Sequence, residues 1–167
     1  MKSKIRFLGL LILILIFVSQ LIFADDSIIS IATFNIRIFS NNSRNDKELY
    51  QICNLLKEFD FIAIQEVRDT VILDRTVSML KNQFNLNYKY LASPKIGRGV
   101  KEIYAFLYRT DKVEYLEESY VFSDEEDFFI REPFFAKFKA GNFDFYVIRY
   151  TQSGVIVSQR GEMKHYY

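Results

Sequence analysis

The stretch FIAIQEVRD, residues 61–69, starts as an apolar run and finishes on charged residues. A run that is apolar on both faces, as Phe61 to Ile64 is, is typical of a strand covered on both sides. Glu66 stands at the end of this strand and is followed by Arg68. A buried carboxylate is costly unless it is paired with a cation. The stretch therefore predicts a buried strand whose last carboxylate is paired with a positive group or binds a metal ion.

The sequence around this strand predicts alternating strands and helices. IISIATFNIR, residues 28–37, is typical of a first strand, and residues 46–59 and 72–84 place apolar side chains at helical spacing. Further strands are predicted over residues 88–94, 102–110 and 112–123, and a hairpin over residues 132–150. This order predicts an α/β (α+β) domain with a mixed sheet and helices on its outer face.

Composition indicates one domain without an internal disulfide. The chain has 167 residues, which suggests a single domain, and half of them are hydrophobic, which is enough to form a core. Cys53 is the only cysteine, so no intramolecular disulfide can form. Its place on the apolar face of the helix at residues 46–59 favours a buried core residue over a reactive thiol.

The N-terminal segment predicts export. Basic residues precede an apolar run over residues 7–18, and small or polar residues follow it. This pattern is typical of a secretory signal peptide, which we assign to residues 1–24, and it predicts a secreted or periplasmic protein. An uncleaved membrane anchor is the alternative, because residues 21–23 could extend the apolar run and Ile22 does not suit a cleavage site. Cleavage would leave no stable association with the membrane.

The charge balance limits how the protein could bind a polyanion. The formal net charge is +1, and removal of the signal peptide would take away three positive charges and no negative ones. A slightly acidic chain does not bind nucleic acid through its whole surface. Any contact with nucleic acid would therefore use local arginines.

Polar residues gather where the first two predicted strands end. Asn35 is followed by Arg37, and Glu66 is followed by Arg68. Because a helix connects these strands, they can be parallel neighbours, and ligands bind at the carboxyl ends of such strands. Amide and carboxylate oxygens suit Mg²⁺, and arginines suit phosphate. The alternative is that these four residues form only ion pairs and caps at the strand ends.

Four motifs resemble those of deoxyribonuclease I-like proteins, in the endonuclease/exonuclease/phosphatase superfamily. They are IATFNIR, IQEVRD, GVKEIYAFLYR and REPFFAKF, and they occur in the family's order and spacing between Ile28 and Ile148. The resemblance implies that residues 25–148 form the N-terminal half of a four-layer α/β/β/α sandwich. It also implies metal-dependent hydrolysis of DNA phosphodiester bonds, with Mg²⁺, Ca²⁺ or Mn²⁺ as the cofactor.

The resemblance also assigns roles to individual residues. By motif, Asn35 and Glu66 resemble the metal-site residues, and Glu66 and Glu102 resemble catalytic carboxylates, with Glu102 orienting a catalytic histidine. The implied DNA contacts, to the phosphate backbone and the minor groove, come from four arginines: Arg37, Arg68, Arg98 and Arg131.

The chain departs from the family pattern in several places. Val100 stands where an aromatic residue often stacks on the nucleotide, and the family's disulfides are absent. The only histidine, His165, lies in a polar tail and does not fit a catalytic motif. Residues 149–167 lack the expected His-Thr pair, and under one permitted choice of codons a one-nucleotide insertion near codon 149 would restore it. We therefore expect an aberrant, frameshifted tail and a truncated chain that is inactive alone.

Two further readings stay open from the sequence. The first is an exported phosphodiesterase of the same superfamily that acts on phospholipid head groups through the same metal edge. The second is a non-catalytic module that kept DNA or partner binding after it lost its second half. The deoxyribonuclease reading is favoured because the motifs IQEVRD and REPFFAKF are typical of that branch.

Overall fold

The computed structural model describes residues 28–150 and 154–158. The predicted signal peptide, His165 and most of the predicted aberrant tail lie outside these residues. Within the described part, no helix is long and apolar enough to cross a membrane.

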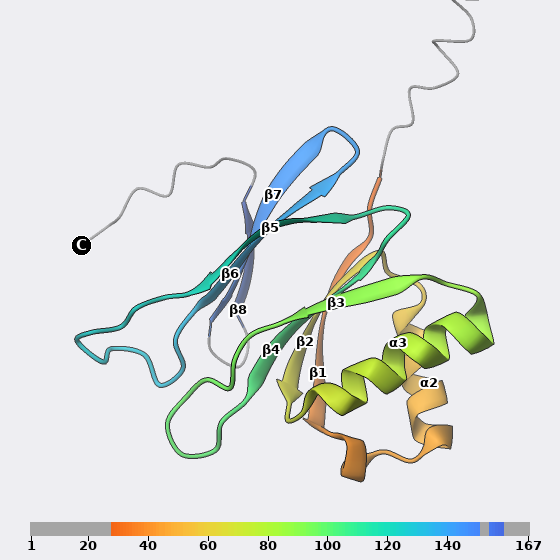
Figure 1. Cartoon of the computed structure of the whole chain (residues 1–167), viewed down its shortest axis with the longest axis horizontal. Coiled ribbons are helices and arrows are strands. Elements are labelled where there is room, and N and C mark those ends of the chain that lie inside the picture. The colour runs from red at the N-terminus through yellow and green to blue at the C-terminus, as the bar shows by residue number, and fades with distance from the viewer. Residues whose placement is uncertain (1–27, 151–153, 159–167) are drawn as a thin grey trace, which may run out of the picture.

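The first sheet is mixed, as predicted. Its strands are β1 (Ile31–Phe39), β2 (Phe61–Val67), β3 (Tyr88–Ala92) and β4 (Ile103–Arg109), and their order in space is β1-β2-β4-β3 (Figure 1). β1 and β2 are parallel, whereas β4 is antiparallel to both β2 and β3. The parallel pair is possible because a helix connects β1 to β2 and returns the chain to the same end of the sheet.

Two helices cover the outer face of this sheet (Figure 1). Helix α2 (Asp46–Leu56) begins at a capping box, in which the Asn45 side chain accepts from the Glu48 amide and the Glu48 carboxylate accepts from the Asn45 amide. Helix α3 (Thr70–Phe84) is capped by the Asp69 carboxylate, which accepts from an amide of the first turn. A single 3₁₀ turn, η1 (Asn41–Ser43), precedes α2. Both predicted helices are confirmed.

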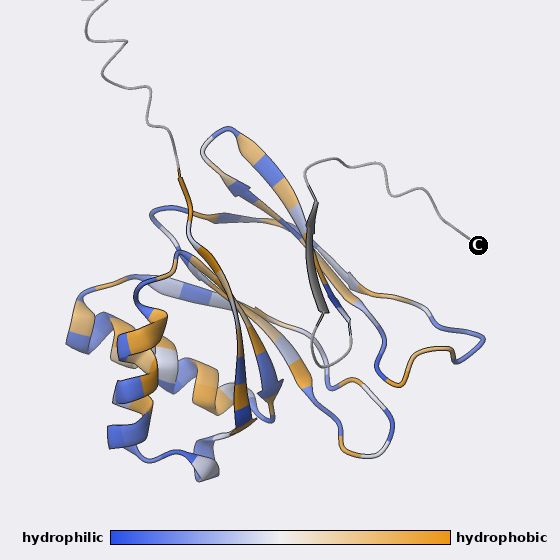
Figure 2. Cartoon of the chain, turned by 180° about the vertical axis from the view of Figure 1, so that it is seen from behind, coloured by the Kyte–Doolittle hydropathy of each residue, from blue (hydrophilic) through white to orange (hydrophobic). Residues whose placement is uncertain are grey.

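The helices pack through their apolar faces. Figure 2 shows polar and apolar residues alternating along both of them. Their buried apolar residues contact the first sheet in one cluster: Leu49, Cys53, Leu56, Ile72, Leu73 and Leu80. The prediction that Cys53 is a core residue is confirmed, and burial raises the pKa of its thiol to about 12. The thiol therefore stays protonated and unreactive at neutral pH.

The second sheet is antiparallel throughout. Its strands, in both chain and spatial order, are β5 (Glu114–Val121), β6 (Phe134–Ala140), β7 (Phe143–Tyr150) and β8 (Gly154–Ser158). The predicted hairpin is β6–β7, and its turn uses Gly141 at a φ of 57°, a conformation that favours glycine. β8 was not expected, because the sequence after residue 149 shows no clear period. Its backbone nevertheless pairs with β7.

An aromatic core joins the two sheets. The Phe61 ring lies 4.8 Å from Phe138 and 5.6 Å from Phe145 between centroids, and the Phe106 ring lies 5.6 Å from Phe134. All five rings are buried. The first sheet is therefore covered by helices on one face and by the second sheet on the other. This explains why β2 is apolar on both faces, and it gives three layers of the predicted sandwich within the described residues.

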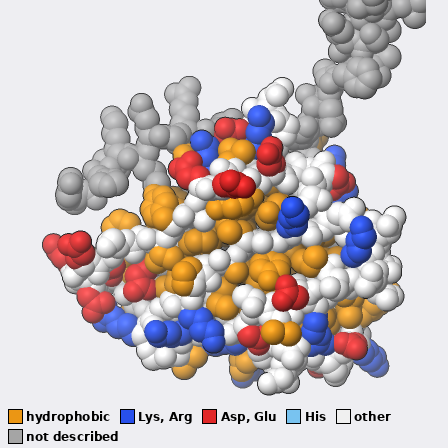
Figure 3. Space-filling model, viewed as in Figure 1, with side chains coloured by type: hydrophobic (Ala, Val, Ile, Leu, Met, Phe, Trp, Pro, Cys, Tyr) orange, Lys and Arg blue, Asp and Glu red, His pale blue; other side chains and the backbone are white. Residues whose placement is uncertain are grey.

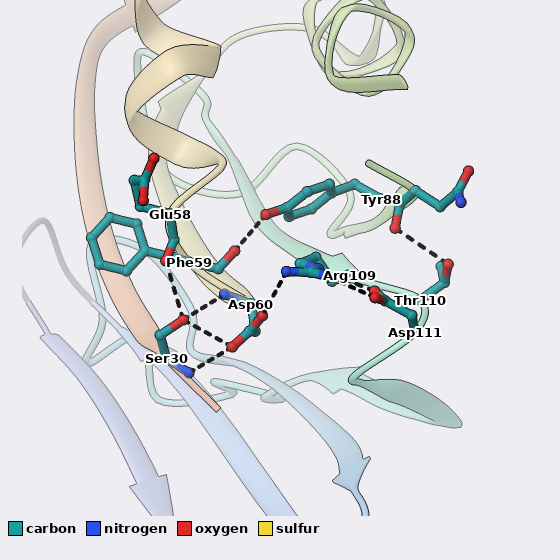
Figure 4. A network of polar contacts seen from close by, with 9 residues as sticks. Ser30, Glu58, Phe59, Asp60, Tyr88, Arg109, Thr110 and Asp111 are labelled. Carbon is teal, nitrogen blue, oxygen red and sulfur yellow. Dashed lines mark hydrogen bonds and ion pairs between the residues drawn. The ribbon is translucent and has the colours of Figure 1, made fainter. Parts of the chain in front are cut away.

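A polar network fixes the end of the sheet where β2 begins (Figure 4). The Asp60 carboxylate accepts from the amide and hydroxyl of Ser30, both at 2.9 Å, and lies 3.4 Å from the Arg109 guanidinium. Arg109 also pairs with Asp111 at 2.6 Å, and the Tyr88 hydroxyl donates to the Phe59 carbonyl at 2.5 Å. The network ties the start of β1 to β2 and to the end of β4.

Replacing the cation of this network should destabilise the fold. In Arg109→Met the mostly buried Asp60 carboxylate loses its positive partner, so we expect the free energy of unfolding to fall by about 1–3 kcal/mol. Urea denaturation of the full chain measures this. Lys47→Met, on the exposed surface of α2, is the matched control and should stay within about 0.5 kcal/mol of the parent chain.

The effect of Arg109→Met should also depend on pH. The hydrogen bond from Arg109 holds the pKa of Asp111 below its ordinary value. A carboxylate with a lowered pKa stabilises the fold above its unfolded-state pKa, and this contribution is lost as the pH falls through the folded-state value. The stability difference between the parent chain and Arg109→Met should therefore narrow below about pH 4. A difference that is constant from pH 7 to pH 3 would contradict the assigned pairing.

Candidate active site

The carboxyl ends of β1 and β2 lie side by side, as the sequence predicted. The two strands pair in register from Ile31 opposite Phe61 to Asn35 opposite Gln65. This register places Asn35 next to Glu66, close enough for its side chain to help lower the pKa of the Glu66 carboxyl. The two residues that the sequence assigned to a metal site are therefore neighbours at one edge of the sheet.

Both strands bend out of regular geometry at this edge. The pairing of β1 with β2 shifts between Asn35 and Phe39, and β2 also shifts against β4 beyond Ile64. Ile38 has a φ of 50° and Glu66 a φ of 58°, in the left-handed region that side chains rarely adopt. The Ile38 amide donates to Glu66 Oε2 at 3.1 Å. Sequence reasoning missed Ile38, because its contribution is a backbone amide and an isoleucine gives no signal for this conformation.

The surroundings of Glu66 keep its carboxylate charged. Its pKa lies below the ordinary glutamate value, chiefly because the Ile38 amide donates to it, and further because of Asn35 and the positive charges of Arg68 and Arg37. Partial burial opposes these effects without cancelling them. Glu66 is thus an ionised carboxylate at neutral pH. Its Oε2 lies 3.9 Å from Nη2 of Arg68.

Glu102 forms the centre of a second, buried group of charges. Its Oε1 lies 3.2 Å from Arg68 and 3.0 Å from Arg131, and the residue is 4% exposed. Arg68 follows β2 in the first sheet, and Arg131 precedes β6 in the second. The sequence expected Glu102 to orient a histidine. In the described part of the chain, which contains no histidine, it holds two arginines instead.

The two remaining predicted arginines differ in their positions. Arg37 is exposed at the end of β1 and acts electrostatically on Glu66. Arg98 lies on the β3–β4 loop, where its guanidinium pairs with the Asp127 carboxylate and donates to main-chain carbonyls of the β5–β6 loop. The structure therefore brings together six of the seven predicted residues: Asn35, Arg37, Glu66, Arg68, Glu102 and Arg131. Arg98 stands apart from them.

The donor set at the edge suits a magnesium ion. Asn35 can offer an amide oxygen and Glu66 an ionised carboxylate, and the strand register brings the two residues to the same edge. Among the described residues, no group of three or more histidine, cysteine or acidic residues could hold a metal ion. Mg²⁺ is commonly bound by one or two carboxylates together with water and substrate phosphates, so two protein ligands fit this ion.

The chain is similar in sequence to known deoxyribonucleases. Human deoxyribonuclease-1-like 2 is 36% identical over 123 residues, which cover 70% of this chain and 40% of that protein. Deoxyribonuclease-1 of Rattus norvegicus is 35% identical over 142 residues, which cover 80% of this chain and 49% of that protein. The resemblance to deoxyribonuclease I-like proteins is confirmed. No protein-family model matches the chain.

These matches cover only part of each relative. The chain spans less than half the length of both deoxyribonucleases. Among solved structures, humanized D. rerio TDP2 matches with a TM-score of 0.49 and 19% identity, over 74% of this chain and 46% of that one.

The strained backbone conformation of Ile38 should lower the free energy of unfolding. Replacing Ile38 by glycine keeps the amide that donates to Glu66 and removes the side chain that disfavours a positive φ. We expect Ile38→Gly to raise the free energy of unfolding by about 1 kcal/mol. The control is Ile31→Gly, in the same strand and with similar exposure, 40% against 46%. Its φ is not positive, so this substitution should destabilise the chain. Equal destabilisation by both would contradict strain at Ile38.

Proposed function

We propose that this chain takes part in the metal-dependent hydrolysis of DNA phosphodiester bonds. The observation that carries the proposal is the meeting of Asn35 and Glu66 with three arginines at one edge of the first sheet. This edge combines oxygen ligands for a cation with hydrogen-bond donors for phosphate. The relatives of the chain in sequence are deoxyribonucleases. The catalytic activity of a whole deoxyribonuclease is a proposal for this chain, which spans less than half of such a protein.

In this proposal, Asn35 and Glu66 hold Mg²⁺, with Ca²⁺ or Mn²⁺ as other candidates. When bound, the cation would stabilise negative charge on the phosphoryl oxygens. The chain's own contribution is to keep Glu66 ionised, through the Ile38 amide and the nearby arginines. Glu102 fixes two guanidinium groups beside this edge, so their planar donors are oriented before a phosphate arrives.

Arg37, Arg68 and Arg131 are the proposed contacts to the DNA backbone, with the minor groove between the contacted phosphates. Their charges are local, which agrees with a chain whose total charge is close to neutral. The N-terminal pattern of residues 1–24 supports export, so we propose that the protein acts outside the cytosol. Extracellular or periplasmic DNA is then the substrate class that fits both features.

Metal binding can be tested without measuring catalysis. Mn²⁺ serves as the probe, and electron paramagnetic resonance of the free ion reports its binding to the full chain. Glu66→Gln removes the anionic ligand at nearly constant volume, so we expect affinity to fall at least about tenfold. Glu114→Gln, an exposed acid on β5, is the control and should leave the affinity unchanged. Equal affinity in Glu66→Gln and the parent chain would remove Glu66 from the metal site.

The pH dependence gives this test a second readout. Because the pKa of Glu66 is lowered, protonation should compete with Mn²⁺ only below the ordinary glutamate pKa of about 4.3. Binding should hold from neutral pH down to that region and then be lost. Loss of binding between pH 7 and pH 6 would point to a different ligand.

DNA binding should depend on the arginines of the edge. Arg68→Ala and Arg131→Ala should each weaken binding of duplex DNA to the full chain, and each should reduce the salt slope of the affinity by about 1. Fluorescence anisotropy at several salt concentrations measures both quantities. Lys89→Ala removes an exposed charge on β3, opposite Tyr108 at the other end of the sheet, and should change neither. If the salt slope stays the same in both arginine variants, these residues are structural and contact no phosphate.

A further inference from the structure

Two loops beside the candidate active site are fastened to each other by Arg98. The β3–β4 loop and the β5–β6 loop project next to one another (Figure 1), with basic side chains over the first and acidic ones over the second (Figure 3). The Arg98 amide donates to the Ile130 carbonyl at 3.2 Å. Its guanidinium donates to the carbonyls of Asp127 at 2.5 Å and Phe129 at 3.4 Å, and it pairs with the Asp127 carboxylate. One residue therefore contacts three residues of the facing loop: Asp127, Phe129 and Ile130.

The facing loop is already folded on itself where Arg98 meets it. The Asp124 carboxylate accepts from the amides of Phe128 and Phe129, at 3.0 and 2.6 Å. The carbonyls that accept from Arg98 belong to residues in or next to this turn: Asp127, Phe129 and Ile130. Arg98 thus recognises a formed turn through a planar set of donors, a geometry that a lysine ammonium does not reproduce.

Gly97, the residue before Arg98, lies against Arg131. Gly97 has a φ of 103°, and a Cβ placed on it would lie 2.8 Å from Cγ and 3.3 Å from Nε of Arg131. Real Cβ atoms essentially never approach a carbon this closely, so only glycine leaves room for the arginine stem. The stem packs on bare backbone here and runs on to Glu102, where the guanidinium lies 3.0 Å from Oε1.

Arg131 depends on this packing because its own hydrogen bonds do not fully hold it. Its Nε is buried and has no hydrogen-bond partner within the described part of the chain. A buried donor without an acceptor costs free energy, and an arginine that swung into solvent would recover that cost. The backbone of Gly97 lies against the Arg131 stem and limits its movement, in addition to the ion pair with Glu102.

We propose that Gly97 and Arg98 are positioning residues that hold Arg131 at the candidate active site. Arg98 fastens the two loops, Gly97 leaves the space for the Arg131 stem, and Arg131 meets Glu102 together with Arg68. This role differs from the direct DNA contact that the sequence suggested for Arg98, whose donors are directed to the facing loop. That Arg131 then contacts a phosphate rests on the function proposed above, whereas its positioning does not.

The positioning is tested first without DNA. Nuclear magnetic resonance of the full chain resolves arginine Nε–H signals, and exchange with water reports the burial of the Arg131 Nε–H. Gly97→Ala, Arg98→Ala and Arg98→Lys should each speed this exchange by at least about tenfold. Lys95→Ala, an exposed basic residue of the same loop, should leave it within about twofold of the parent chain. Unchanged exchange in both Arg98 variants would overturn the proposal, and Arg98→Lys is mild enough to remain folded.

A double-mutant cycle on duplex DNA affinity then separates positioning from direct contact. If Arg98 acts through Arg131, Arg98→Ala should weaken binding in the parent chain and have little further effect in Arg131→Ala. Additive losses, or full rescue by Arg98→Lys, would show a direct contact through charge and overturn the positioning role. If exchange at Arg131 responds as expected but none of the variants changes DNA affinity, the positioning stands and the proposed function fails.

Discussion

The buried carboxylate of Glu102 is the interaction on which the arrangement of this edge depends. Its two partners come from different sheets: Arg68 follows β2 and Arg131 precedes β6. If Glu102 paired with only one of these arginines, the loop that carries the other would not be tied to this carboxylate. Because breaking a buried pair leaves an uncompensated charge, both loops are held at this carboxylate. The aromatic core brings the sheets together, and Glu102 sets how their ends meet.

The position of Glu66 explains how a carboxylate can stand at the end of a buried strand. It lies near the end of a strand that is buried on both faces, yet its carboxylate is only partly buried. A left-handed residue and a shift in strand pairing turn it to the edge, where the Ile38 amide and two arginines keep it charged. Irregular backbone at such a point directs a side chain that regular pairing would have placed in the core. The strain at Ile38 is therefore tied to the candidate metal site.

Much of the fold could be predicted from local patterns. The helix at Asp46–Leu56 followed from its apolar spacing and the polar loop before it, and the adjacency of Asn35 and Glu66 followed from a parallel crossover. The positive φ values at Ile38 and Glu66 could not be predicted, because tertiary contacts set them and, at Ile38, override a strong β propensity. The position of Arg98 was equally hidden, since its partners are mainly carbonyl groups, which carry no sequence signal. The assigned roles of these residues in catalysis and DNA binding stay predictions.

The two ends of the first sheet carry opposite charge arrangements built from the same kinds of residue. At the end where β2 begins, one cation, Arg109, lies between two carboxylates, Asp60 and Asp111. At the end where β2 finishes, one carboxylate, Glu102, lies between two arginines. Both groups stabilise loops against strands, so stability alone does not distinguish them. The sign of the excess charge distinguishes the two groups. The group of Arg109 has a net negative charge, and the group of Glu102 has a net positive charge. A positive excess that is partly buried and held in fixed geometry attracts phosphate with little reorganisation. The negative excess at the other end of the sheet would repel phosphate, and this difference is why we propose the DNA contacts at the ends of β1 and β2.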